Sequence, residues 1–140
     1  MRHLHILLVE DNEGDILLTT EALAEGSYKF EVSIVKDGVE AIDFVEKKGR
    51  YIKAKTPDFI LLDINLPKKT GHEVLKHIKK CPLGRKIPVI ILSTSSFEKD
   101  IELSNQNNAN YYLTKPLEME VLEKVLSEID QFKDIMNITN

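Results

Sequence analysis

The sequence predicts an α/β protein in which a parallel five-stranded sheet is covered by helices on both faces. Short, continuous apolar runs recur along the chain, such as residues 6–9 and 59–62, and they are typical of strands that are buried on both faces. Segments with apolar residues at helical spacing separate these runs. Strands that alternate with helices pair in parallel, because each helix returns the chain to the same end of the sheet.

The predicted elements follow one another in strict alternation. Strands are expected at residues 4–9, 30–35, 58–63, 88–93 and 110–114. The first helix carries Ile16, Leu17, Thr20, Leu23 and Ala24 at helical spacing, and Gly26 is its expected stop. Residues 47–56 form a basic loop, and a weak helix is expected at residues 101–107. The clearest amphipathic helix follows Pro116, with apolar positions at Val121, Leu122, Val125, Leu126, Ile129 and Phe132.

Composition excludes several classes of protein. The 140 residues are 42% hydrophobic and 30% charged, which is ordinary for one globular domain, and a single domain over residues 1–140 is expected. The apolar runs are far shorter than the ~20 residues that span a bilayer, and no signal peptide is visible. Cys81, the single cysteine, cannot form an internal disulfide, which fits a reducing cytoplasm. The formal net charge of −4, without a basic block, predicts neither nucleic-acid nor membrane partners.

Polar side chains stand where the predicted strands end. Glu10 and Asp11 follow the first strand, Asp63 ends the third, Ser93 ends the fourth, and the fifth leads into Lys115. Ligands of an open parallel sheet bind beyond the carboxyl ends of its strands. Three carboxylates clustered there repel one another, and oxygen ligands without Cys or His favour a hard cation such as Mg²⁺. An ammonium and a hydroxyl beside that cation are suited to a phosphoryl group.

These residues, in this order and spacing, resemble the signature of response regulator receiver domains. The resemblance runs over nearly the whole chain and implies a CheY-like, flavodoxin-like fold with strand order 2-1-3-4-5 and five helices. Residues 9–15 and 62–71 are similar to those of single-domain regulators associated with bacterial phytochromes. Because residues 117–140 hold only the last helix and a tail, no output domain is expected.

The resemblance implies a role for each residue of the site. Asp63 is implied as the phosphoacceptor, which forms an aspartyl phosphate. Metal ligands are implied at Glu10, Asp11, Asp63 and the backbone carbonyl of Asn65, with Mg²⁺ as the cofactor and Mn²⁺ as a substitute. The resemblance also implies which residues bind the phosphoryl group and act as the switch, namely Ser93, Lys115 and Tyr112. The Lys115-Pro116 bond is implied as a candidate for the cis form.

The implied protein is a cytoplasmic single-domain response regulator of a two-component or phosphorelay system. Its phosphoryl donor is a sensor histidine kinase, with the phytochrome type as a candidate, or a phosphotransfer protein. It catalyses only its own phosphorylation and dephosphorylation and signals through protein contacts. A homodimer through the fourth helix, fifth strand and fifth helix is one such contact. Ile135, Met136 and Ile138 leave two interpretations open, since they either cap the core or contact a second subunit.

Each assignment has a plainer alternative. Glu10 and Asp11 also suit the N-terminus of a helix, and Asp63 can cap the loop that follows it. Lys115 can be a surface lysine, Ser93 can belong to a serine-rich turn, and Tyr111 competes with its neighbour Tyr112 for the role of switch.

Three other functions have to be weighed. An aspartyl phosphatase needs an acid two residues after its nucleophile, and Asn65 stands there. A flavodoxin-like carrier needs a phosphate-binding first loop, whereas residues 10–15 are acidic. An adaptor with a receiver fold that is no longer phosphorylated remains as an alternative, although all five site positions are chemically competent.

Overall fold

Five parallel strands form one sheet in the order β2-β1-β3-β4-β5 in a computed structural model, which describes residues 3–26, 28–94, 111–129 and 132. The strands are β1 (His3–Val9), β2 (Lys29–Val35), β3 (Phe59–Leu62), β4 (Val89–Ser93) and β5 (Tyr111–Thr114). The helices are α1 (Glu13–Glu25), α2 (Gly38–Glu46), α3 (Gly71–Lys80), α5 (Met119–Glu128) and the short 3₁₀ turn η1 (Gly49–Tyr51). The predicted fold class is confirmed. The helix expected at residues 101–107, and with it the fourth-helix part of the predicted dimer face, lies outside the described residues.

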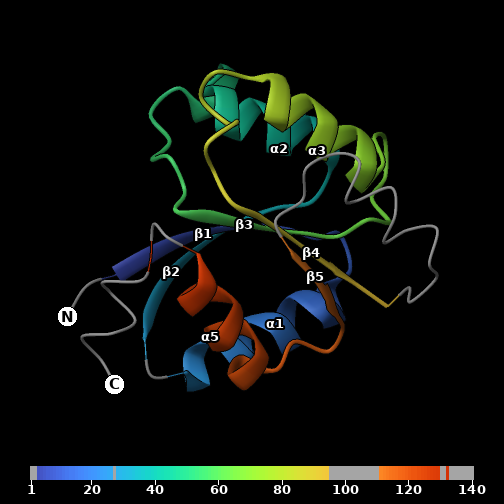
Figure 1. The fold of residues 1–140 in the computed structure, drawn as a ribbon. Coiled ribbons are helices and arrows are strands. Elements are labelled where there is room, and N and C mark those ends of the chain that lie inside the picture. Colours follow the sequence, from blue (N-terminus) through green and yellow to red (C-terminus); the bar gives the residue numbers. More distant parts are fainter. Residues whose placement is uncertain (1–2, 27, 95–110, 130–131, 133–140) are drawn as a thin grey trace.

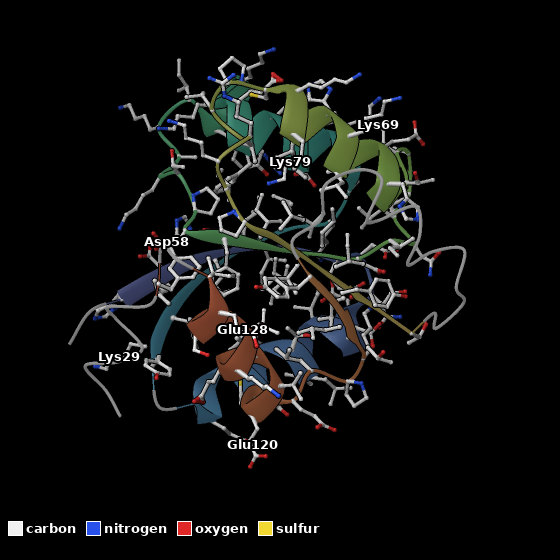
Figure 2. All side chains as sticks on the ribbon, viewed as in Figure 1. Lys29, Asp58, Lys69, Lys79, Glu120 and Glu128 are labelled. Carbon is white, nitrogen blue, oxygen red and sulfur yellow. The ribbon has the colours of Figure 1, made fainter. Side chains whose placement is uncertain are left out.

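The helices form two layers, one on each face of the sheet. Figure 1 shows α2 and α3 above the sheet and α1 and α5 below it. In Figure 2, Lys69 and Lys79 belong to the upper layer, and Glu120 and Glu128 belong to α5 in the lower one. Among the described residues, none of the helices combines the length and the apolar character that crossing a membrane requires.

Alternating side chains of the central strands build a separate core on each face. Leu4, Ile6 and Leu8 of β1 pack into the core that α1 and α5 cover. Leu7 and Val9 pack into the core that α2 and α3 cover. Because successive side chains of a strand point to opposite faces, a strand buried on both sides has to be apolar throughout. This explains why the continuous apolar runs marked the strands correctly.

The inner face of α1 differs from the prediction at two positions. Leu17 and Ala24 were expected to point inward, but both are exposed, and Leu17 keeps 58% of its surface. The buried residues of α1 are Ile16, Thr19 and Leu23. Consecutive apolar residues such as those at 16–18 cannot all face the sheet, because neighbours on a helix point about 100° apart. Pairing with the sheet therefore selects one of them.

The basic stretch at residues 47–56 is more ordered than the loop that the sequence predicted. It contains the η1 turn, and Arg50 of this turn forms an ion pair with Glu40 of α2. The Tyr51 hydroxyl donates to the same carboxylate at 2.9 Å, and its ring packs against Phe44 with 5.2 Å between centroids. These contacts hold the turn against α2.

Parallel pairing brings the carboxyl ends of the strands level with one another. Val9 at the end of β1 is in register with Val35 and with Leu62, the last residues of β2 and β3. Ser93 and Thr114 end β4 and β5 in the same way. The residues that follow these strands are therefore placed along one edge. The opposite edge carries Asp58, whose Oδ2 accepts a hydrogen bond from the backbone N–H of His5 at 2.7 Å (Figure 2).

Candidate functional site

Three carboxylates meet at the carboxyl edge of the sheet. Glu10, Asp11 and Asp63 each offer an oxygen, and these oxygens lie within 4.8 Å of one another. Glu10 and Asp63 are 1% and 6% exposed, whereas Asp11 is exposed. Two buried carboxylates and a third beside them are costly unless positive charge balances them.

Backbone hydrogen bonds hold Asp63 in place. The N–H of Asp63 donates to the carbonyl of Val9 at 3.0 Å, which ties the end of β3 to the end of β1. The Asp63 carboxylate accepts from the backbone N–H of Asn65 at 3.0 Å. Asp63 therefore does cap the loop that follows it, as the alternative suggested, and it does so as a member of the carboxylate cluster.

Glycine at position 71 lets α3 start directly against the strand end. A Cβ placed on Gly71 would lie 2.4 Å from the backbone oxygen of Asp63 and 2.5 Å from Cα of Ile64. Neither backbone atom can move without displacing the phosphoacceptor candidate. We therefore expect any side chain at this position to shift the loop that follows Asp63.

Asn12, rather than Glu10 or Asp11, caps α1. Its side chain accepts from the backbone N–H of Asp15 at 2.9 Å. The alternative in which one of the two acidic residues acts as the helix cap is therefore wrong, and both carboxylates are left to the cluster. The N–H of Asn12 also donates to Oε2 of Glu10 at 3.3 Å.

Lys115 supplies the positive charge of the site. Its ammonium donates to Glu10, to Asp15 at 2.9 Å and to Asp63 at 3.4 Å. The Lys115 side chain is 9% exposed, so the alternative of an ordinary surface lysine is wrong. Its backbone N–H donates to the carbonyl of Ser93 at 2.9 Å, and the peptide bond that joins Lys115 to Pro116 is cis.

Burial and pairing shift the titration of this cluster. Burial raises the pKa of the Glu10 carboxyl to about 7, and its hydrogen bond with Asp63 acts in the same direction. For Lys115, burial alone would lower the pKa of the ammonium. The hydrogen bonds to Glu10 and Asp15 and the charge of Asp63 outweigh that effect and raise this pKa well above its ordinary value. The ammonium therefore stays charged, while the Glu10 carboxyl is partly protonated near pH 7.

The chemistry of the donor set fits a divalent cation. All the clustered donors are carboxylate oxygens, which hard cations prefer. Burial is the main cause of the raised pKa of Glu10, and the hydrogen bond and the charge of Asp63 act in the same direction. A doubly charged ion between these oxygens would remove the remaining repulsion.

Of the two remaining predicted switch residues, Ser93 ends β4 at this edge, whereas Tyr112 lies two residues before the end of β5. Ser93 is fully buried at the end of β4. Tyr112, one residue further along β5 than Tyr111, packs against the core under α2 and α3, whereas Tyr111 packs against the core under α1 and α5. Both tyrosines are partly buried, and their competing claims to the switch role stay predictions.

Asp15 is a member of the site that the sequence reasoning did not single out. It lies on the first turn of α1, four residues after Asp11, and its partner Lys115 is 100 residues away in the chain. Asp11 precedes the helix and Lys115 is distant in the chain, so no local spacing in the sequence signals this contact.

Comparison with known proteins gives one consistent result. Residues 6–127 match the family model of the response regulator receiver domain. The response regulator Rcp1 of Synechocystis sp. (strain ATCC 27184 / PCC 6803 / Kazusa) is 42% identical over 127 residues, which cover 91% of this chain and 86% of Rcp1.

Solved structures are similar over the same length. The phosphorylated cyanobacterial phytochrome response regulator RcpA matches with a TM-score of 0.78 and 46% identity, over 94% of each chain. The Mn²⁺-bound form of Rcp1 matches with a TM-score of 0.76 and 38% identity, over 97% of this chain and 88% of that one. A phosphorylated form and a metal-bound form are therefore both found among similar folds.

Proposed function

Because the chain belongs to the response regulator receiver family, we propose that it is a single-domain regulator that is phosphorylated on Asp63. The donor is a phosphohistidine of a sensor kinase, with the phytochrome type as a candidate, or of a phosphotransfer protein. The observation that carries this proposal is the Asp63 carboxylate itself. It lies at the end of a buried strand, 3.4 Å from an ammonium and in contact with two further carboxylates.

The transfer makes one bond and breaks one. An oxygen of the Asp63 carboxylate attacks phosphorus, the bond from phosphorus to the donor's imidazole nitrogen breaks, and the imidazole leaves with that electron pair. Hydrolysis later returns the carboxylate and inorganic phosphate. Phosphoryl transfer asks a protein mainly for positioning and charge stabilisation, and Lys115 provides charge within hydrogen-bonding distance of Asp63. No other protein side chain has to form a covalent intermediate.

The carboxylates of Glu10, Asp11 and Asp63 and the backbone carbonyl of Asn65 would hold Mg²⁺, for which Mn²⁺ can substitute. When bound, the cation supplies positive charge that stabilises the phosphoryl oxygens. Among this chain's own groups, Asp11 is the exposed member of the cluster and thus the one that meets an ion arriving from solvent.

Phosphorylation then acts as a switch. An aspartyl phosphate brings additional negative charge and oxygen acceptors to the strand edge. Lys115 and the Ser93 hydroxyl bind those oxygens, and Tyr112 follows the movement of Ser93. A partner protein or a second copy of the chain reads the altered surface around β5 and α5. The energy involved is a bias between two states on the order of 1–3 kcal/mol.

Intact mass measurement tests the proposal. The wild-type chain and the Asp63→Asn variant are incubated with acetyl phosphate and Mg²⁺, and each mass is recorded before and after. We expect one phosphoryl group on the wild type, removable with hydroxylamine, and none on the variant. Equal, hydroxylamine-sensitive labelling of both proteins would contradict the assignment of Asp63.

A further inference from the structure

The ion pair between Asp15 and Lys115 is not explained by metal binding or by phosphoryl transfer. Lys115 Nζ lies 2.9 Å from Oδ2 of Asp15 and 3.4 Å from Oδ2 of Asp63. We propose that Asp15 is a positioning residue, which holds Lys115 toward α1 in the unphosphorylated protein and competes with the incoming phosphoryl group for its ammonium. This inference rests on the proposed function, since it requires phosphorylation of Asp63.

The hydrogen-bonding capacity of Lys115 is already taken. A lysine ammonium has three N–H donors and no acceptor. In the structure these donors face three carboxylates, those of Glu10, Asp15 and Asp63. A phosphoryl group on Asp63 adds three acceptor oxygens. One donor can pass from Asp63 to the phosphoryl group that this residue then carries. For Lys115 to donate to a second phosphoryl oxygen, Glu10 or Asp15 has to give up its share of the ammonium.

Burial decides which carboxylate gives way. The side chain of Glu10 is 2% exposed, whereas that of Asp15 is 34% exposed. A buried carboxylate that loses its counter-charge is strongly destabilised. A partly exposed carboxylate is rehydrated at lower cost. Asp15 is therefore the partner that Lys115 leaves.

Asp15 also has room to turn away from the site. A surface hollow of about 230 Å³ opens between α1 and the segment after β5, and its lining includes Asp15, Leu18 and Lys115. Water in this hollow can solvate the released carboxylate. The backbone of Asp15 stays fixed meanwhile, because its N–H is held by the Asn12 cap.

Competition of this kind affects phosphorylation and hydrolysis unequally. Before phosphorylation, the pair with Asp15 has to be broken for Lys115 to stabilise the transition state, so the pair slows phosphoryl entry. In the phosphorylated protein, Lys115 already donates to the phosphoryl group, so the ion pair with Asp15 is broken before hydrolysis starts. Only interactions that differ between the starting state and the transition state change a rate. Asp15 should therefore slow entry and leave hydrolysis nearly unchanged.

Glu13 offers a matched control on the same turn of α1. Its carboxylate forms an ion pair with Lys36, and both side chains are well exposed, at 73% and 56%. The change Glu13→Gln removes the same charge as Asp15→Asn from the same end of the helix, but it leaves the partners of Lys115 unchanged. It therefore reports the general effect of charge on the approach of an anionic donor.

The experiment measures both rates in wild type, Asp15→Asn, Asp15→Glu and Glu13→Gln. Phosphorylation by acetyl phosphate in Mg²⁺ is followed by intact mass over time, and hydrolysis is followed after the donor is removed. We expect Asp15→Asn to raise the entry rate about two- to fivefold, the range that a partly exposed ion pair is worth. Its hydrolysis rate should change less than about twofold. The Asp15→Glu and Glu13→Gln variants should resemble the wild type.

An entry rate for Asp15→Asn equal to or below that of the wild type would overturn the inference. So would an equal increase in Glu13→Gln, because the effect would then come from charge alone. Hydrolysis that changes as much as entry would also contradict it. In all these cases Asp63 would still be phosphorylated, so the proposed function would stand. A wild-type chain that takes no phosphoryl group would overturn both.

Discussion

Two ionic clusters in this protein each contain a lysine and a glutamate, but they differ in how far the lysine is exposed. At the carboxyl edge of the sheet, Lys115 is surrounded by Glu10, Asp15 and Asp63, and its side chain is 9% exposed. Between α2 and α3, Glu46 accepts from His77 at 2.8 Å and pairs with Lys48 at 3.0 Å. There the side chains of the two partners, His77 and Lys48, are 47% and 67% exposed.

The two clusters also titrate in opposite directions. Burial raises the pKa of Glu10, whereas hydrogen bonds from His77 and Lys48 lower the pKa of Glu46. In the first cluster, burial disfavours the ionised form of Glu10. In the second, hydrogen bonds from the more exposed partners favour the ionised form of Glu46. Costly buried charge concentrates at functional sites, so this contrast separates the candidate site from ordinary surface ion pairs.

Removing Lys115 should have the largest effect on stability. In Lys115→Gln, Glu10 and Asp63 stay buried beside each other without a cation. We expect the free energy of unfolding to fall by about 3 kcal/mol, measured by urea denaturation above pH 7 with EDTA, and added Mg²⁺ should recover part of the loss. Lys48→Gln in the exposed cluster is the control and should leave the transition unchanged. Equal losses in the two variants would contradict the contrast.

Neutralising Glu10 should stabilise the metal-free protein in a pH-dependent way. The Glu10 carboxyl keeps its proton up to about pH 7 in the folded chain, but it loses it near the ordinary value of 4.5 in the unfolded chain. The folded state binds more protons in this window, so the free energy of unfolding of the wild type falls as the pH rises through it.

The variant Glu10→Gln lacks this fall. The difference in the free energy of unfolding between the variant and the wild type should grow from pH 4.5 to pH 7. Above pH 7 it should favour the variant by about 1–3 kcal/mol. Urea denaturation in EDTA at several pH values measures the difference. A difference that is constant with pH would show that burial does not hold the proton on Glu10.

Replacing Glu46 should have the smallest effect. We expect Glu46→Gln to lose at most about 1 kcal/mol of stability, and less at high salt. Because the pKa of Glu46 is lowered in the folded state, its contribution is present above the ordinary value of 4.5 and is lost as the pH falls through the folded value. Urea denaturation of the two proteins should therefore converge in acid, and a loss as large as that of Lys115→Gln would contradict the account.

Much of the fold could be predicted because burial on both faces constrains the central strands. Runs such as Phe59–Leu62 have to be apolar at every position, and the alternation with helices requires parallel pairing. The inner face of α1 could not be predicted in the same way. Ile16, Leu17 and Leu18 are equally apolar, and only packing against the sheet decides that Ile16 is buried.

The grouping of the site residues could be predicted for a topological reason. Parallel strands end at one edge of the sheet, so topology alone predicts that Glu10, Asp63 and Lys115 lie close together. The directions of their side chains do not have to be known. The pair between Asp15 and Lys115 depends on which way a helix face turns, and it joins residues 100 apart in the chain. Spacing within the sequence carries no information on such a contact.

The central claim is that Asp63, among the clustered carboxylates, takes the phosphoryl group. Borohydride reduces an acyl phosphate to an alcohol and so converts a phosphorylated aspartate to homoserine, which peptide mass mapping can locate. After treatment with acetyl phosphate, we predict homoserine at position 63 in Mg²⁺ and none in EDTA. Homoserine at Asp11 or modification of Glu10 in place of position 63, or equal conversion at position 63 in EDTA, would contradict the account.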